Sequence, residues 1–170
     1  MVNKMREIKV EKVTLNMSTG EPGPELEKAK KLLEIISGSK VIYTKTRKRN
    51  TFGVAKGRKI GVMTTMRGKK AMDKLTILLK AVENRLKPSQ FDSSGNFSFG
   101  IAEYIEIPGI DYEPEIGIKG LDVAVTLERP GYRVKKRKYR PGRIGKSHTL
   151  KAEESIEWAK KALGVTVAVA

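Results

Sequence analysis

The stretch VTLNMS, residues 13–18, decides the fold, because its apolar and polar residues alternate as they do in a half-buried strand. One face carries Val13, Leu15 and Met17, and the other carries Thr14, Asn16 and Ser18. The alternation continues upstream to Ile8, but its phase slips at Glu11-Lys12, which predicts a β-bulge there. We therefore expect a strand with one face against a core and one polar face.

Four further segments have the composition of strands: residues 41–47, 60–67, 96–107 and 121–127. In residues 60–67 the polar face carries Thr65 and Arg67, which places them beside Thr14 and Asn16 if the two strands pair. In residues 96–107 the apolar positions are Phe97, Phe99, Ile101, Ile105 and Ile107. A sheet of about five strands follows.

Three segments have helical spacing. The first runs from Leu26 to Ile36 and ends at Gly38. The second covers residues 69–86, with an apolar stripe made of Met72, Leu75, Leu79, Val82 and Leu86. The third is capped by Thr149 and carries Glu153 and Glu154 in its first turn. The simplest architecture is α+β, with these helices packed on one face of one sheet.

The composition limits the class of protein. A chain of 170 residues fits a single domain spanning residues 1–170, of which residues 1–5 have no pattern and are expected to be disordered. The absence of cysteine excludes disulfides, thiolate zinc sites and cysteine nucleophiles. No apolar run reaches the ~20 residues that cross a bilayer, and the N-terminus lacks the pattern of a signal peptide. We expect a cytoplasmic protein that does not contact membranes.

Two tracts of the chain are strongly basic and contain no carboxylate. Residues 45–59 form a basic loop with seven lysines and arginines, and residues 129–146, RPGYRVKKRKYRPGRIGK, hold nine. The formal net charge is +16, and a charge of this size favours binding to nucleic acid. Residues 101–128 instead hold seven acids against Lys119 alone, so we expect them to lie away from RNA.

Little in the sequence indicates catalysis. His148 is the only histidine, which excludes a multi-histidine metal site, and we interpret it as an exposed residue close to RNA or at a helix cap. Gly145-Lys146-Ser147 is similar to the end of a phosphate-binding loop, but the glycine that this loop needs is replaced by Arg140. No cofactor and no metal are predicted.

A family resemblance rests on several motifs. Residues 91–101, FDSSGNFSFGI, with Glu103 and the IDY of residues 110–112, closely resemble the signature of ribosomal protein L-five, the 5S rRNA-binding protein of the large subunit. The motifs VTLNM (13–17), VMTTMRG (62–68) and GLD (120–122) also match, so the resemblance covers essentially the whole chain. The basic extension, residues 129–148, resembles the archaeal and eukaryotic branch, whose eukaryotic member is called L-eleven.

The resemblance implies a curved, mostly antiparallel sheet whose concave polar face holds 5S rRNA. On that basis the residues expected to bind 5S rRNA are Thr14, Asn16, Ser39, Lys45, Thr65 and Arg67. Position 39 is glutamine in many relatives, so the shorter Ser39 would reach RNA only through water. The residues expected to contact tRNA or the rRNA backbone are Arg47, Lys48, Arg49, Phe52, Lys56, Arg58, Lys59, Arg133, Lys135, Lys136, Arg137, Lys138, Arg140, Arg143 and Lys146.

The function that the resemblance implies is structural. The chain would bind 5S rRNA in the central protuberance, help join it to the large-subunit rRNA and contact P-site tRNA. Its neighbours would include other ribosomal proteins, one of them a small-subunit protein across the intersubunit bridge. Two alternatives stay open on basicity alone: an RNA-processing or RNA-modifying enzyme with a basic platform, and a DNA-compacting protein. The first requires a pocket with a tuned acid, which the sequence does not offer.

Overall fold

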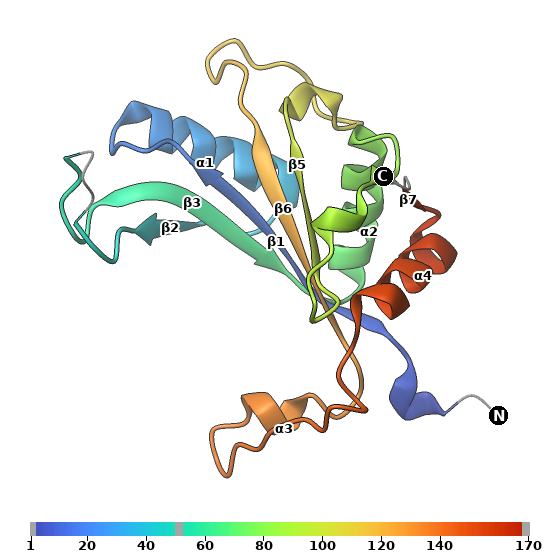
Figure 1. The fold of residues 1–170 in the computed structure, drawn as a ribbon. Coiled ribbons are helices and arrows are strands. Elements are labelled where there is room, and N and C mark those ends of the chain that lie inside the picture. Colours follow the sequence, from blue (N-terminus) through green and yellow to red (C-terminus); the bar gives the residue numbers. More distant parts are fainter. Residues whose placement is uncertain (1–2, 50–52, 168–170) are drawn as a thin grey trace.

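A five-stranded antiparallel sheet forms the centre of the computed structural model, which describes residues 3–49 and 53–167 (Figure 1). The strand order is β2-β3-β1-β6-β5, and every neighbouring pair is antiparallel. The strands are β1 (Lys9–Ser18), β2 (Ile42–Lys45), β3 (Lys59–Met66), β5 (Phe97–Ile101) and β6 (Leu121–Glu128). The predicted fold class, α+β with about five strands, is confirmed.

The alternation in β1 is the one that the sequence predicts. Val13, Leu15 and Met17 are buried, whereas Thr14 and Asn16 are only half-buried on the opposite face. The register against β6 shifts between Val10 and Lys12, which confirms the predicted bulge.

Two helices cover the apolar face of the sheet, α1 (Pro24–Ser37) and α2 (Gly68–Ala81) (Figure 1). The buried side chains of α1 and α2, such as Leu33 and Leu75, share one core with Val13 and Leu15 of β1. Gly38 ends α1 in the left-handed conformation, with a φ of 57°, as its position in the sequence predicts. Within residues 3–49 and 53–167 no helix lies across the opposite face of β1 and β3, and the short helix α3 (Arg133–Lys136) reaches only its end, where Lys136 pairs with Glu11 (Figure 1).

The second helix is shorter than predicted. It ends at Ala81, because Glu83 and Asn84 take positive φ angles of 55° and 54° and turn the chain. Leu86 fits the helical spacing but is buried in a strand, β4 (Arg85–Leu86), which pairs in parallel with β7 (Thr166–Val167) near the C-terminus. The helical spacing of Leu86 is therefore overridden by strand pairing with Val167, which lies more than 80 residues away in the chain.

The last helix, α4 (Ala152–Leu163), begins at a different cap from the predicted one. Lys151 is the N-cap, and the Glu154 carboxylate accepts a hydrogen bond from the Lys151 N–H at 3.2 Å. The Thr149 hydroxyl instead donates to the Gly145 carbonyl oxygen at 3.2 Å. Helix α4 packs closely on Gly95, since a Cβ at that position would lie 2.3 Å from the Ser155 hydroxyl oxygen.

Three short 3-10 turns complete the described chain. One of them, η3 (Tyr104–Glu106), interrupts the segment that we expected to stay extended up to residue 107. It buries Tyr104, whose hydroxyl accepts a hydrogen bond from the Glu113 N–H at 3.0 Å, and leaves Ile105 39% exposed. The others are η2 (Pro88–Gln90) and η1 (Lys4–Arg6), the latter in a segment where the sequence shows no pattern.

Candidate nucleic-acid interface

The face of the sheet without helices, called the open face from here on, carries the polar residues that the sequence places there. Thr14 of β1 lies opposite Thr65 of β3, and both are half-buried. Asn16 lies between Met63 of β3 and Asp122 of β6. Hydroxyl and amide groups of this kind can bond to ribose hydroxyls and to base edges.

The other residues expected on the 5S rRNA surface lie at its two ends. Arg67 is exposed directly after β3, and Lys45 is exposed at the opposite end, where it pairs with Lys59. Lys59 and Arg67 are eight residues apart along the strand direction, a distance of about 26 Å at the usual rise of a strand. The Ser39 hydroxyl accepts a hydrogen bond from Lys70 Nζ at 2.7 Å, so a cation lies directly beside this position.

The basic loop between β2 and β3 is closed at its base. The Thr46 N–H donates to the Arg58 carbonyl oxygen at 2.9 Å, and the Thr46 hydroxyl donates to that of Ala55 at 2.8 Å. Lys59 lies 4.6 Å from the centre of the Tyr43 ring. The remaining predicted cations are exposed: Arg47, Lys48, Arg49, Lys56 and Arg58. Phe52 lies outside the described residues.

The basic extension has a root that is packed into the fold. Arg129 is only 5% exposed, and its guanidinium lies 3.0 Å from the Glu154 carboxylate of α4 and donates to the His148 carbonyl oxygen at 3.3 Å. The Tyr132 hydroxyl donates to the same oxygen and accepts from the Leu150 N–H. His148 was predicted to be exposed; it is half-buried, with Nε2 2.9 Å from the Pro130 carbonyl oxygen, because it joins the two ends of the extension.

One cation of the extension is bound within the chain. Lys136, at the end of the short helix α3 (Arg133–Lys136), lies 2.6 Å from Glu11 and 2.8 Å from Glu128. Burial by itself lowers the pKa of Lys136, but hydrogen bonds to the two carboxylates outweigh burial and raise it above its ordinary value. Lys136 thus stays charged, but two carboxylates already neutralise it, so it should contribute less to phosphate binding than its place in the basic tract suggests.

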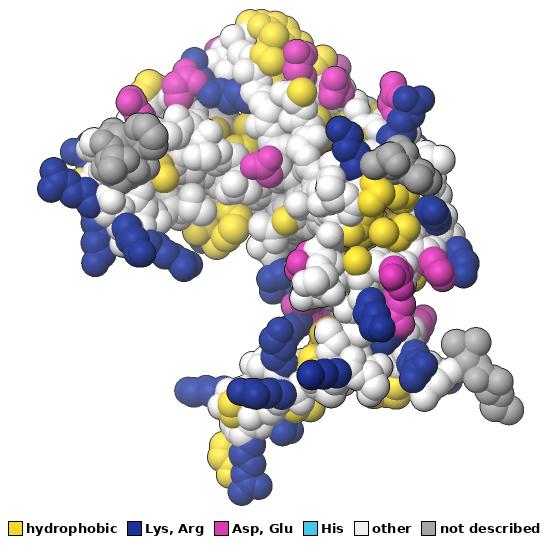
Figure 2. Space-filling model, in the orientation of Figure 1, with side chains coloured by type: hydrophobic (Ala, Val, Ile, Leu, Met, Phe, Trp, Pro, Cys, Tyr) yellow, Lys and Arg dark blue, Asp and Glu magenta, His cyan; other side chains and the backbone are white. Residues whose placement is uncertain are grey.

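The other predicted cations of the extension are exposed and have no ion pair among the residues that the structure describes: Arg133, Lys135, Arg137, Lys138, Arg140, Arg143 and Lys146. Figure 2 shows lysines and arginines over the projecting extension and around the β2–β3 loop, with a hollow between these two parts. The open face thus lies between two sources of positive charge.

A groove of about 610 Å³ runs along the junction of the extension with β1 and β6. Its lining is mixed: Lys12, Lys135 and Arg143 supply cations, Ser94, Asn96 and Thr126 supply hydroxyl and amide groups, and Leu127 and Ile144 supply apolar surface.

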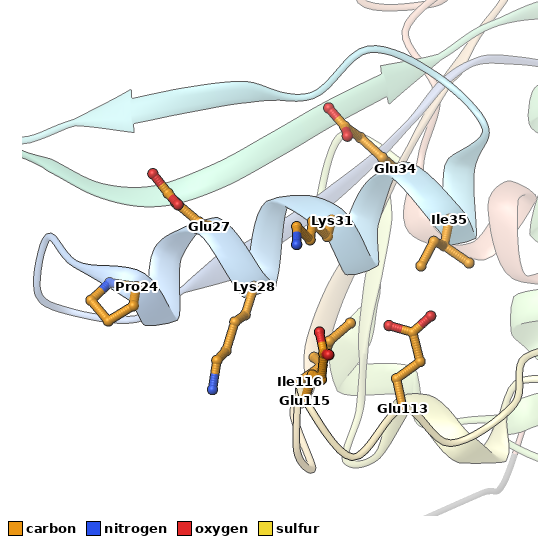
Figure 3. A pocket seen from close by; sticks show the side chains of 9 residues that line it. All are labelled: Pro24, Glu27, Lys28, Lys31, Glu34, Ile35, Glu113, Glu115 and Ile116. Carbon is orange, nitrogen blue, oxygen red and sulfur yellow. The ribbon is translucent and has the colours of Figure 1, made fainter.

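The acidic segment lies mainly where it was expected, but not entirely. Glu113 and Glu115 line a hollow of about 630 Å³ against α1, on the side of the sheet covered by helices (Figure 3). Lys119 pairs with Glu25 of α1, and this hydrogen bond lowers the Glu25 pKa. Two residues of the segment, Asp122 and Glu128, lie instead on the open face, where Asn16 and Lys9 of β1 are their cross-strand partners. The acidic segment is therefore not confined to the helix-covered side of the sheet.

Two observations bear on other classes of protein. Among the described residues, no helix is long and apolar enough to cross a membrane, and no group of three or more acidic or histidine side chains could hold a metal ion. The groups with shifted pKa values, Glu25, Lys136 and Glu154, all belong to ion pairs that join elements of the fold.

Comparison with known proteins identifies the family. A family model for the C-terminus of the ribosomal L5 protein family matches residues 59–158, and one described as "Ribosomal protein L5" matches residues 3–54. The chain belongs to the ribosomal protein L5 (L-five) family. The "Large ribosomal subunit protein uL5" of Sulfurisphaera tokodaii is 49% identical, over 98% of this chain and 95% of the relative. That of Nanoarchaeum equitans is 47% identical, over 98% and 99%.

Membership of the L5 family gives the chain a structural role in the large ribosomal subunit, because its relatives are named as ribosomal proteins rather than enzymes. The relatives named here are archaeal, in agreement with the branch that residues 129–148 resemble. Sequence reasoning missed the anchoring residues Arg129 and Tyr132 and the position of Asp122. Of these, only the position of Asp122 could have been predicted, because the alternation of residues 121–127 places it on the polar face of its strand.

Proposed function

We propose that the chain binds 5S rRNA through the open face, in the central protuberance, and helps join it to the large-subunit rRNA. The observation that carries the proposal is the pairing of Thr14 with Thr65, next to Asn16, on a face that no helix covers. RNA is recognised through ribose hydroxyls and base edges, and these neutral groups can bond to both. The family supports the same partner.

The cations at both ends of this face supply most of the affinity. Each neutral hydrogen bond contributes only about 0.5–1.5 kcal/mol net, whereas neutralising 6–10 phosphates makes affinity fall by about 10³–10⁵ between 50 and 200 mM salt. The open face then selects the RNA that the cations attract. The β2–β3 loop, which projects from the sheet, contacts P-site tRNA in this proposal (Figure 1).

A competition experiment tests the proposal. A structured 5S rRNA fragment and a DNA duplex of equal charge compete for the purified chain, and 5S rRNA should win by a wide margin. Equal binding of the two would contradict the proposal and favour general binding of polyanions. Chemical footprinting of 5S rRNA, with and without the chain, then locates the contact.

Two substitutions test the surface itself. Asn16→Ala and Thr65→Ala should each weaken binding of 5S rRNA by about threefold to tenfold, since each removes a hydrogen bond without removing charge. Thr76→Ala on the exposed side of α2 is a matched control and should leave binding unchanged. If Asn16→Ala instead lowers the melting temperature sharply and leaves the affinity of the folded protein unchanged, the face has been assigned wrongly.

A further inference from the structure

One carboxylate on the open face, that of Asp122, has no partner among the residues that the structure describes. The five strands of the sheet contain three acids, Glu11, Asp122 and Glu128. Lys136 neutralises Glu11 and Glu128. The Asp122 carboxylate has neither an ion pair nor a hydrogen bond with any residue that the structure describes, and the residue is exposed. A bare negative charge on a surface that faces RNA is unfavourable unless the RNA itself offers it hydrogen-bond donors.

The register shows what surrounds Asp122. The row that crosses the sheet at this level consists of Ile42, Met63, Asn16, Asp122 and Gly100. Gly100 carries no side chain that could cover the carboxylate from β5, and an added Cβ there would already contact Asp122 Oδ1 at 3.7 Å. Asn16 lies on the other side, with side chains of such cross-strand neighbours about 5 Å apart at Cβ. The row thus presents an amide beside a carboxylate, both open to a ligand.

The hydrogen-bond donors that RNA offers limit which of its groups the Asp122 carboxylate can bind. An ionised carboxylate only accepts hydrogen bonds, and phosphates offer none, so its possible partners are ribose hydroxyls and base N–H groups. Guanine alone carries two adjacent donors on its Watson–Crick edge, at N1 and N2, which match the two oxygens of a carboxylate. The acceptor O6 lies next to N1, where the amide of Asn16 can donate to it. Ile42, which is 60% exposed, continues the row as an apolar surface for a ribose or base.

We propose that Asp122, with Asn16 beside it, binds the Watson–Crick edge of an unpaired guanine in the RNA and so determines specificity. This inference rests on the proposed function, because it concerns the same face. The inference says that an acidic side chain strengthens binding to a polyanion. The direction in which RNA affinity changes when Asp122 is removed therefore tests it. If Asp122 were merely a solvated charge, its removal would strengthen RNA binding.

The test measures binding of 5S rRNA to Asp122→Ala, Asp122→Asn and Glu115→Ala. We expect Asp122→Ala to weaken binding by about tenfold or more and Asp122→Asn to weaken it less, since an amide oxygen still accepts one bond. Glu115→Ala removes the same charge from the helix-covered side and should leave binding unchanged or slightly tighter. Equal or tighter binding by Asp122→Ala overturns the inference.

Interference mapping then identifies the base. Inosine, which lacks the N2 amino group, is incorporated sparsely into 5S rRNA, and the positions at which it prevents binding are mapped. At least one guanine should be sensitive with the wild type and insensitive with Asp122→Ala. The absence of such a position overturns the assignment to guanine. If the wild type does not prefer 5S rRNA to duplex DNA, the proposed function fails, and this inference fails with it; tight binding by both proteins contradicts the inference alone.

Discussion

The two basic tracts have similar charge but are attached to the fold in different ways. The extension, residues 129–146, is held by a buried arginine, by Tyr132 and by the pairs that Lys136 makes with β1 and β6. Among the described residues, the base of the β2–β3 loop is closed by hydrogen bonds from Thr46 to Ala55 and Arg58. We therefore expect the extension to present its cations from a fixed root, at a lower cost in conformational entropy on RNA binding than cations without such an anchor. The same charge should thus contribute differently to affinity.

The largest effect is expected from removing charge from either tract. One variant replaces four cations of the extension with glutamine: Lys135, Lys138, Arg140 and Arg143. The other replaces four of the loop: Arg47, Lys48, Arg49 and Lys56. If all four contact phosphates, the slope of log affinity against log salt should fall by about 3 in each case.

The affinities of the two variants for 5S rRNA, measured at one salt concentration, then distinguish the contribution of the extension from that of the loop. The extension variant should lose more affinity than the loop variant, since the root of the extension is fixed by a buried ion pair and by hydrogen bonds before RNA binds. Titrations at several salt concentrations measure both quantities. A slope that does not change for one variant would show that this tract does not reach the RNA.

The second effect concerns the root of the extension. Arg129→Met should destabilise the fold by about 1.5–3 kcal/mol, since it removes hydrogen bonds between charged groups at a buried position. Urea unfolding followed by circular dichroism measures this free energy. Arg140→Ala, an exposed position in the same tract, is the control and should stay within about 0.5 kcal/mol of the wild type. Similar losses in the two variants would mean that the root does not anchor the extension.

The third effect distinguishes Lys136 from its basic neighbours. Lys136→Gln should cost about 0.2–1 kcal/mol for each of its two partly exposed pairs, and it leaves Glu11 and Glu128 unneutralised. Proteolysis should then cut the extension faster than in Lys135→Gln, whose side chain is exposed and unpaired within the described chain. Equal cleavage rates would contradict an anchoring role for Lys136.

The smallest expected effect is a pH dependence of the stability that the Arg129–Glu154 pair gives to the root of the extension. Partial burial raises the pKa of Glu154, but the Arg129 guanidinium outweighs it, so the folded pKa lies below the ordinary 4.5. The stabilisation is therefore present above pH 4.5 and is lost as the pH falls through the folded pKa. Glu154→Gln should flatten this part of the stability profile. For Lys136 the raised pKa gives the opposite sign, with stabilisation present below pH ~10 and lost as the pH rises further.

Much of the fold could be predicted because the signal is local. The alternation around Leu15 and Val62 assigns the two faces of the sheet, and Gly38 ends α1 where its backbone freedom predicts. The end of α2 could not be predicted, since Leu86 satisfies helical spacing and only its pairing with β7 removes it from the helix. Ile105 was misassigned for a similar reason, because Tyr104 takes the buried position.

The sequence predicts which kinds of side chain form the candidate interface, but not which of its charges are already neutralised within the fold. Residues such as Asn16 and Thr65 follow from strand periodicity, and the cations follow from composition. Which cations are already neutralised does not follow, since Lys136 meets Glu11 across 125 positions of the chain. The assignment of Asp122 to a remote surface failed because residues 101–128 were treated as a single acidic segment. Within that segment the side chains of β6 alternate between the core and the open face, and Asp122 lies on the open face.

The bulge in β1 has a consequence for how this chain tolerates changes in length. Val10 and Val13 are an odd number of residues apart, yet both pack toward the helices, because Glu11 is an extra residue without a counterpart in β6. Deleting Glu11 would leave Val10 and Val13 two residues apart, so β1 would pair with β6 without a bulge and both side chains would stay on the core face. The same deletion would take from Lys136 one of its two carboxylates. The bulge thus places a carboxylate beside the extension without changing which side chains of β1 face the core.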